Sequence, residues 1–233
     1  MPMPILKYED FVGALLNAGF SMGGGNDEGI YAAVPWNWNE EPPYATPVRW
    51  HTGNMETDPW EWRMRVLDER NDIAYAKVFF KKSGYITKEW YPFFIAARRT
   101  SAFEDAYQEG TISRHAKRIY DVLARQEPLP VHVMKELAGF AKEEKAVFER
   151  ALVELQMKMY VTMCGRQAKI SPKGQEYGWS STVFCTVESF FEPEVMEKAA
   201  QLDKAEAVAQ IKAQIKKINP AAAEKKIIKF IQG

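Results

Sequence analysis

The chain has 233 residues, of which 46% are hydrophobic and 13% aromatic, so it is long and apolar enough to bury the core of one large domain or two small ones, and it is not a disordered chain. Its 31 basic and 31 acidic residues balance, which removes the overall positive charge typical of nucleic-acid-binding proteins. No apolar run approaches the ~20 residues of a membrane-spanning helix, and the first residues lack a signal-peptide profile, so we expect a cytoplasmic protein without membrane contact.

The first segment predicts one helix followed by a loop. Apolar residues share one face of a helix over residues 7–18, and Gly19 ends it. The glycine run at 23–25 carries no Gly-Lys-Ser/Thr or Gly-x-Gly-x-x-Gly pattern, so it predicts a loop rather than a phosphate-binding site. We expect no cofactor.

Tryptophan and proline dominate residues 35–63. This segment has too much proline for a regular element and too many aromatic residues to stay away from the core, so we expect an irregular lid. Asp58 and Pro59 have the residue types of an N-cap and a first helical position, which predicts a helix over residues 60–70.

Residues 73–99 combine an apolar run with a local excess of basic residues. The apolar run covers residues 73–80, and Gly84 separates it from a predicted helical stretch that begins at Thr87. Residues 100–112 have the composition of a polar connector. The basic side chains face a single acid, Glu89, and they are Lys77, Lys81, Lys82, Lys88, Arg98 and Arg99. Such a run forms either a basic patch or a solvated charged face.

The strongest pattern lies between residues 113 and 190. Ser113 caps a predicted amphipathic helix, a second helix runs from Pro130 to Gly139, and a third covers residues 142–157. Residues 159–164 alternate as a strand, 165–167 make a turn, 168–170 form the return, and a further strand follows over 182–187. Three short helices followed by a strand pair predict a winged helix-turn-helix module, within a mostly helical α+β protein.

The tail from residue 194 to 232 is helical by composition and interrupted at Asn219-Pro220. One apolar stripe runs along it, formed by Val208, Ile211, Ile215 and Ile218. We expect the stripe to dock on the body of the chain or on a second copy, which would give a homodimer through the C-terminal helices. The expected regions are therefore 1–112, 113–190 and 191–233.

Cysteine and histidine residues give no sign of a metal centre. Cys164 and Cys185 lie in apolar, strand-like stretches without a Cys-x-x-Cys pair, and His51, His115 and His132 are scattered without His-Glu-x-x-His spacing. We expect two buried, reduced thiols, with neither a disulfide nor a metal site.

Two stretches resemble the bacterial AlkZ-related proteins. The first joins the residues WHTGNMETDPWEW at 50–62 to AYAKVFFKKSGYITKEWYP at 74–92. The second runs from LAGF at 137–140 through LQM at 155–157, MYVT at 159–162, Lys173-Gly174 and YGW at 177–179 to Val187-Glu188. Together they cover about two thirds of the chain.

The resemblance implies winged-helix structure and a distant likeness to AlkZ-type DNA glycosylases, which excise alkylated or cross-linked bases. Those enzymes carry a catalytic Gln-x-Asp or Gln-x-Gln motif ahead of a DNA-contacting wing. The formal match here is Gln201-Leu202-Asp203, which lies in the tail, beyond the predicted module. The catalytic residues are therefore unknown, and enzyme activity stays an open question.

The first functional interpretation is a DNA-binding or DNA-repair-related protein with duplex DNA as its partner. Four glutamates offset the basic residues of the third helix, so we expect phosphate contacts on the wing, on the first helix and in the basic segment. The candidate residues are Arg114, Lys117, Arg118, Arg166, Lys169, Lys173, Lys81 and Lys82.

The second interpretation is a non-catalytic module that binds a ligand or a protein, with the winged helix as scaffold. Its candidate residues, for stacking and polar contacts, are His51, Asp58, Trp60, Trp62, Trp90 and Tyr91. Core packing is the alternative role for the tryptophans. A hydrolase has little support, because there is no Gly-x-Ser-x-Gly elbow, although His51, Glu56 and Asp58 have the residue types of acid-base catalysis.

Overall fold

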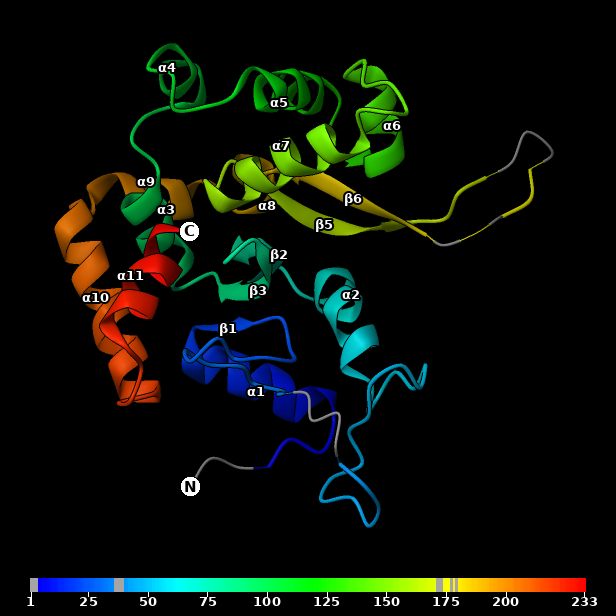
Figure 1. Ribbon diagram of the computed structural model, residues 1–233, viewed down its shortest axis with the longest axis vertical. Coiled ribbons are helices and arrows are strands. Elements are labelled where there is room, and N and C mark those ends of the chain that lie inside the picture. The colour runs from blue at the N-terminus through cyan, green and yellow to red at the C-terminus, as the bar shows by residue number, and fades with distance from the viewer. Residues whose placement is uncertain (1–3, 36–39, 171–173, 177, 179) are drawn as a thin grey trace.

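The computed structural model describes residues 4–35, 40–170, 174–176, 178 and 180–233, and it has an α+β architecture built on one antiparallel sheet (Figure 1). The strand order across the sheet is β1-β3-β2-β5-β6-β4. The strands are β1 (Phe20–Met22), β2 (Ile73–Phe79), β3 (Lys82–Thr87), β4 (Leu129–Pro130), β5 (Val161–Gln167) and β6 (Ser181–Thr186). Strands from distant parts of the sequence therefore share one sheet.

Helices cover both sides of this sheet. Those of the first half are α1 (Tyr8–Ala18), α2 (Pro59–Glu69), α3 (Tyr91–Arg98), α4 (Phe103–Gln108) and α5 (Arg114–Gln126). Those of the second half are α6 (Val131–Leu137), α7 (Lys145–Met157), α8 (Val187–Phe190), α9 (Pro193–Gln201), α10 (Lys204–Ile218) and α11 (Glu224–Gln232). In the described part of the chain, none of them is both long and apolar enough to cross a membrane.

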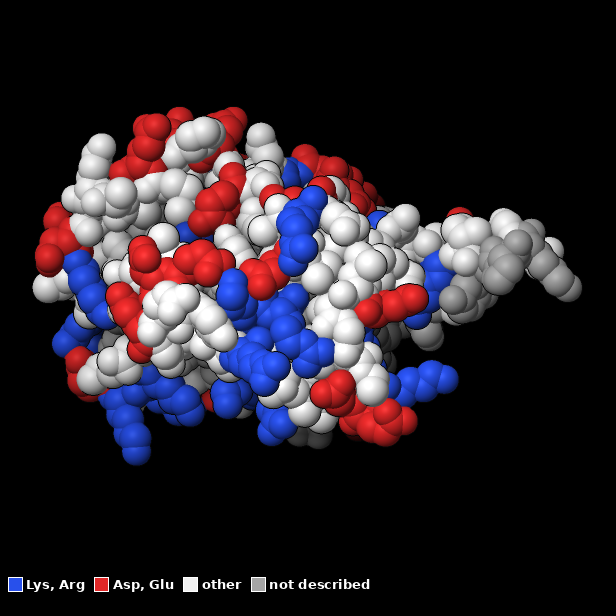
Figure 2. Space-filling view, turned by 90° about the horizontal axis from the view of Figure 1, so that it is seen from above, with Lys and Arg blue, Asp and Glu red and all other residues white. Residues whose placement is uncertain are grey.

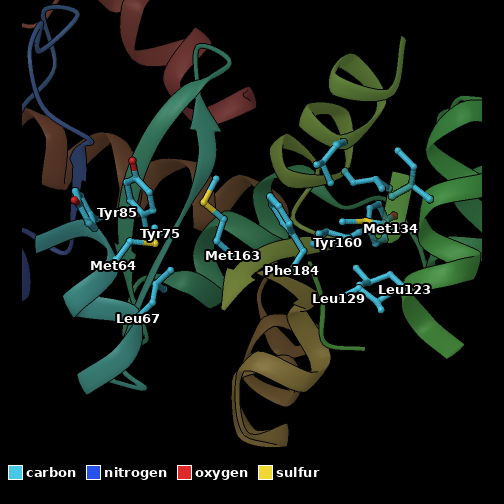
Figure 3. Close-up of a cluster of buried hydrophobic side chains, with 14 of the residues drawn as sticks. Met64, Leu67, Tyr75, Tyr85, Leu123, Leu129, Met134, Tyr160, Met163 and Phe184 are labelled. Atoms are coloured by element: carbon cyan, nitrogen blue, oxygen red, sulfur yellow. The ribbon is translucent and has the colours of Figure 1, made fainter. Parts of the chain in front are cut away.

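Two hydrophobic cores form because successive side chains of a strand point to opposite faces. Ile73 and Tyr75 of β2 join the first core, which contains buried residues of α1, α2, α5, α6 and α7. Ala74 and Ala76 join the second core, which contains buried residues of α3, α9, α10 and α11. Figure 3 shows the first core running from the β2–β3 side past Met163 to the α5–α6 side.

Local signals position three of the helices as predicted. Gly19 has a left-handed φ of 86° and its N–H closes α1 on the Leu15 carbonyl. The Asp58 carboxylate accepts the Trp60 N–H at 2.8 Å, and the Ser113 hydroxyl accepts the Ala116 N–H at 3.1 Å. These N-cap predictions are confirmed because caps depend on neighbouring residues only.

Gly84 does not end the apolar segment, because it lies inside β3, opposite Met22 and Ala76. A Cβ atom at this position would come within 2.3 Å of the Phe79 ring and 2.9 Å of the Ser21 carbonyl oxygen. The glycine is therefore needed for close packing in the sheet and not for a turn.

Three further predictions are wrong. The helical stretch expected from Thr87 begins at Tyr91, because Thr87 is the last residue of β3. Residues 103–108 of the expected connector form α4, because Phe103 and Ala106 are buried in the first core. The turn expected at 165–167 is part of β5, which pairs with β6 through a register shift between Met163 and Gly165 and continues to Gln167. The hairpin is consequently longer than predicted.

The three predicted regions remain a prediction about sequence organisation, but they share their cores. Tyr75 of β2 pairs with Met163 of β5, so the sheet of the N-terminal region continues into the hairpin of the middle region. In the tail, Ile211 and Ile215 of α10 are buried in the second core of the same chain. The apolar stripe is thus used within the chain, while dimerisation stays a prediction.

Candidate functional site

A groove follows the outer side of α7 and consists of two adjoining cavities. We call the cavity of about 340 Å³ the α6–α7 pocket and the cavity of about 840 Å³ the α7–α11 cavity, and the two together the α7 groove. Lys77, Glu149 and Val153 line both cavities. The 13 residues of α7 extend for about 20 Å at the helical rise per residue, so the groove is longer than a single side-chain pocket.

The amphipathic sequence of α7 creates the groove. Phe148, Ala151, Leu152 and Leu155 turn into the first core, which leaves Glu149 and Arg150 on the outer side. Beneath the helix, Lys77 is the exposed residue of the otherwise buried strand β2. Its side chain therefore points out of the sheet beside α7.

Gln156 joins α7 to the sheet at this point. Its side chain is buried, its Oε1 accepts the Lys77 N–H at 2.9 Å, and its Nε2 donates to the Leu152 carbonyl at 2.9 Å. A β-strand N–H that would otherwise be buried and unpaired is thereby satisfied. Gln156 could not be identified from the sequence, because a single glutamine in an amphipathic helix carries no signal of a partner 79 positions away.

Basic residues outnumber acidic ones along the groove. The cationic side chains that line it are Lys77, Lys81, Arg98, Lys135, Lys145, Arg150 and Lys158, and the acidic ones are Glu149 and Glu154. Figure 2 shows acidic and basic side chains interspersed over the face seen from above, with basic side chains gathered near its middle. The groove is therefore a local exception to the balanced net charge.

Several of these charges already have partners. Glu149 lies 3.8 Å from Lys145, Glu154 accepts the Ser113 N–H at 2.9 Å, and Lys158 donates to the Thr111 carbonyl at 2.7 Å. Four cations make neither an ion pair within 4.0 Å nor a side-chain hydrogen bond among the described residues, and they are Lys77, Lys81, Lys135 and Arg150. These four leave positive charge available to a ligand.

Four of the eight predicted phosphate-contacting residues have partners within the protein. Lys117 lies 2.8 Å from Glu104 and 2.9 Å from Asp121, which raise its pKa through side-chain hydrogen bonds. Arg118 donates to the Ala138 and Gly139 carbonyls at 2.9 and 2.7 Å and so caps the C-terminal end of α6.

On the hairpin and on β3 the predicted cations are also paired. Arg166 faces Glu61 and Asp68 of α2, at 3.6 and 3.9 Å, and Lys82 pairs with Glu28. The four remaining candidates are Arg114, which is exposed, Lys169, which is half-buried, Lys81, which lines the α7 groove, and Lys173, which lies outside the described residues. Of the eight, only Lys81 is known to line this groove.

Asp58 has a structural role in the loop that precedes α2. It is buried, and its carboxylate accepts N–H groups from Thr52 and Gly53 at 2.7 and 2.8 Å in addition to that of Trp60. Beside it, the rings of His51 and Trp60 lie 4.7 Å apart. These three candidates are close together.

The other three ligand candidates pack against the two hydrophobic cores, Trp62 against the first and the chain neighbours Trp90 and Tyr91 against the second. Trp62 is buried in the first core, with its ring stacked on Phe11 at 5.0 Å. Tyr91 is buried in the second core, where burial raises the pKa of its hydroxyl. Trp90 packs on the Phe20 ring at 5.5 Å, on the same side of the sheet as Tyr91. The six residues do not form one pocket.

Neither the cysteines nor the formal Gln-Leu-Asp match forms a catalytic arrangement. Both cysteines are free, Cys185 is buried and Cys164 half-buried, and they act on each other: hydrogen bonding from Cys185 lowers the pKa of the Cys164 thiol. Asp203 caps α10 by accepting the Ala205 N–H at 2.8 Å. Among the described residues, no group of three histidine, cysteine, aspartate or glutamate side chains is placed to hold a metal ion.

Comparison with known proteins identifies one family. The family model described as "AlkZ related" matches residues 5–232, which is nearly the whole chain and includes both stretches that carry the resemblance seen in the sequence. No curated protein and no solved structure matches the chain.

Proposed function

The chain belongs to the AlkZ-related family, and on this premise we propose that it is a DNA-binding protein related to DNA repair, in which residues 113–190 act as a winged helix-turn-helix module. Three helices, α5, α6 and α7, followed by the β5–β6 hairpin support that module. One departure is the connection 138–144 between α6 and α7, which is longer than the three or four residues of a typical helix-turn-helix.

The observation that carries the proposal is the set of unpaired cations along the α7 groove. Lys77 and Lys81 come from the basic segment of the sequence, and they line the groove together with Arg150 of α7. Phosphate contacts from such side chains supply most non-specific affinity for DNA. We therefore place the main phosphate contacts along α7 and the β2–β3 hairpin, and not on the β5–β6 hairpin, where Arg166 is paired with α2.

The acidic residues near α7 oppose DNA less than their number suggests. The Glu144 carboxylate accepts the Ala141 N–H at 2.9 Å, Glu154 accepts the Ser113 N–H, and Glu149 faces Lys145. Each of these carboxylates has part of its charge directed at a group of the protein itself. Repulsion of phosphate by the third helix is correspondingly reduced.

The proposal covers binding and assigns no catalytic step. Asp203, the acid of the formal Gln-x-Asp match, directs its side chain to two backbone N–H groups at the start of α10. The match is thereby explained as a helix cap.

Fluorescence anisotropy with a labelled duplex, measured over a range of salt concentrations, tests the proposal. We expect the double variant Lys81→Ala/Arg150→Ala to bind more weakly and to lower the salt slope by about 0.9 for each phosphate that the variant no longer neutralises. The matched control is Lys217→Ala/Lys225→Ala, which removes two exposed lysines of α10 and α11. Duplexes with an abasic or an alkylated site show in parallel whether a lesion is preferred.

Two results would overturn the proposal. The first is an absence of DNA affinity for the wild-type protein even at low salt, and the second is an equal reduction of affinity in the control variant. The first result makes the protein-interaction module the better interpretation, and the second refutes the α7 groove as the phosphate-contacting surface. The feature that favours the protein-interaction module is the surface around Trp60, which is 38% exposed and lies under the Arg63 guanidinium at 3.3 Å.

A further inference from the structure

The α6–α7 pocket has the dimensions and the apolar lining of a small-molecule site. Its volume of about 340 Å³ lies within the ~300–1,000 Å³ of typical ligand pockets. Met163 and Phe184, which Figure 3 shows on neighbouring strands, contribute apolar surface from the sheet. The apolar residues from the two helices are Val131, Phe148, Leu152 and Val153.

The polar side chains of the pocket are predominantly cationic. Lys77 comes from β2, Lys135 from α6 and Lys145 from α7, with His132 beside them. Glu149 is the acidic residue among those that line the pocket, and it faces Lys145 at 3.8 Å. An apolar interior with a basic rim is complementary to a ligand with a flat apolar body and an anionic group.

Contacts between neighbouring elements hold the walls in place. His132 Nδ1 lies 2.9 Å from the Ser181 hydroxyl, which ties α6 to β6. The Phe148 ring packs edge-on against Phe140 at 5.3 Å, and Gln156 is bonded at both ends of its amide. The pocket is therefore preformed, which lowers the entropic cost of binding.

We propose that the α6–α7 pocket binds a small organic anion of the aryl carboxylate class. The ring system packs between Phe148, Phe184 and Met163, and the carboxylate accepts hydrogen bonds from Lys135 and Lys77. The binding needs no DNA. A second consequence, which rests on the proposed function, is competition: Lys77 lines both cavities of the α7 groove, so a bound carboxylate weakens its interaction with phosphate.

Isothermal titration calorimetry with 2-naphthoate, and with the uncharged 2-naphthylmethanol as its matched probe, tests the site. We expect 2-naphthoate to bind about tenfold more tightly than the alcohol, because charge-assisted hydrogen bonds are stronger than neutral ones. Lys135→Met, which keeps the aliphatic stem, should remove most of this difference and leave the affinity for the alcohol unchanged. Lys217→Met is the control and should alter neither affinity.

A second variant tests the location. Val153→Trp places a large side chain in the pocket from a half-buried position on α7, so it should abolish binding of both probes while circular dichroism shows an unchanged helical content. The proposal is overturned if 2-naphthoate does not bind, if Lys135→Met binds it normally, or if folded Val153→Trp still binds it.

The labelled duplex separates this proposal from the proposed function. If 2-naphthoate binds and the duplex does not, the pocket stands and the DNA-binding proposal fails. If both bind and 2-naphthoate leaves the affinity for DNA unchanged, the competition is refuted and the pocket stands.

Discussion

Replacement of Arg98 should destabilise the protein more than replacement of any exposed arginine. Its half-buried side chain donates to four carbonyls, those of Ile231 and Phe230 in α11, Met157 at the end of α7 and Val78 in β2, at 2.8–3.0 Å. Burial lowers its pKa to about 9, so the side chain stays charged at neutral pH. One side chain thus caps the C-terminal ends of two helices, where a cation also complements the helix dipoles.

The magnitude follows from two opposing effects. Four charge-assisted hydrogen bonds would stabilise the folded state by about 1.5–3 kcal/mol each. The dehydration of the cation on folding offsets much of this gain. Removing one member of a buried charged arrangement typically costs about 3–5 kcal/mol, and the half-buried Arg98 should lie near the lower end of this range. We expect this decrease in the free energy of unfolding of Arg98→Ala, a large part of the ~5–15 kcal/mol of a typical domain.

Urea unfolding followed by circular dichroism gives the decrease, and hydrogen exchange locates it. Arg98→Lys should lose most of the same stability, because an ammonium group cannot reproduce the fork of the guanidinium. Arg114→Ala, at an exposed site, should stay within about 0.5 kcal/mol of wild type. A decrease below about 1 kcal/mol for Arg98→Ala, or faster exchange that is uniform and not concentrated in α11, would refute this reasoning.

Two further predictions concern titratable groups. Burial raises the pKa of Tyr8 to about 12, above the value near 10 of an unfolded chain, so its contribution to stability is present below about pH 10 and lost as the pH rises toward 12. Tyr8→Phe should therefore shift alkaline unfolding to higher pH, and an unchanged alkaline transition would contradict this. In the native protein, iodoacetamide should label the half-buried Cys164 before Cys185. The hydrogen bond with Cys164 raises the pKa of the Cys185 thiol, and burial raises it further, so Cys185 forms less of the reactive thiolate. Mass spectrometry of the labelled peptides measures the order, and simultaneous rapid labelling would be inconsistent with it.

The helices are largely predictable because their signals are local. Gly19, Asp58 and Ser113 end or begin helices through contacts with residues a few positions away. The strand order is not predictable, because the pairing of Tyr75 with Met163 joins segments that no turn connects. Gly84 resists prediction for the same reason, since its need for close packing arises from the folded Phe79 ring.

The candidate site is predictable only in part. Lys81 stands out in the basic segment, but its position beside α7 depends on the sheet that carries the β2–β3 hairpin. Composition gives the charge of the third helix, whereas the hydrogen bonds of Glu144 and Glu154 depend on tertiary geometry. The sequence gives the number of charged side chains, whereas the fold determines which of them are paired within the protein.

The continuous sheet also determines how a partner meets the α7 groove. Strands β2, β5 and β6, which line the α6–α7 pocket, are hydrogen-bonded neighbours in one sheet, and Gln156 joins α7 to β2. The part of the groove between α7 and these strands therefore keeps its width unless the sheet bends. Association is therefore expected to proceed as rigid-body docking, in which any adjustment of shape falls to the partner and not to this protein.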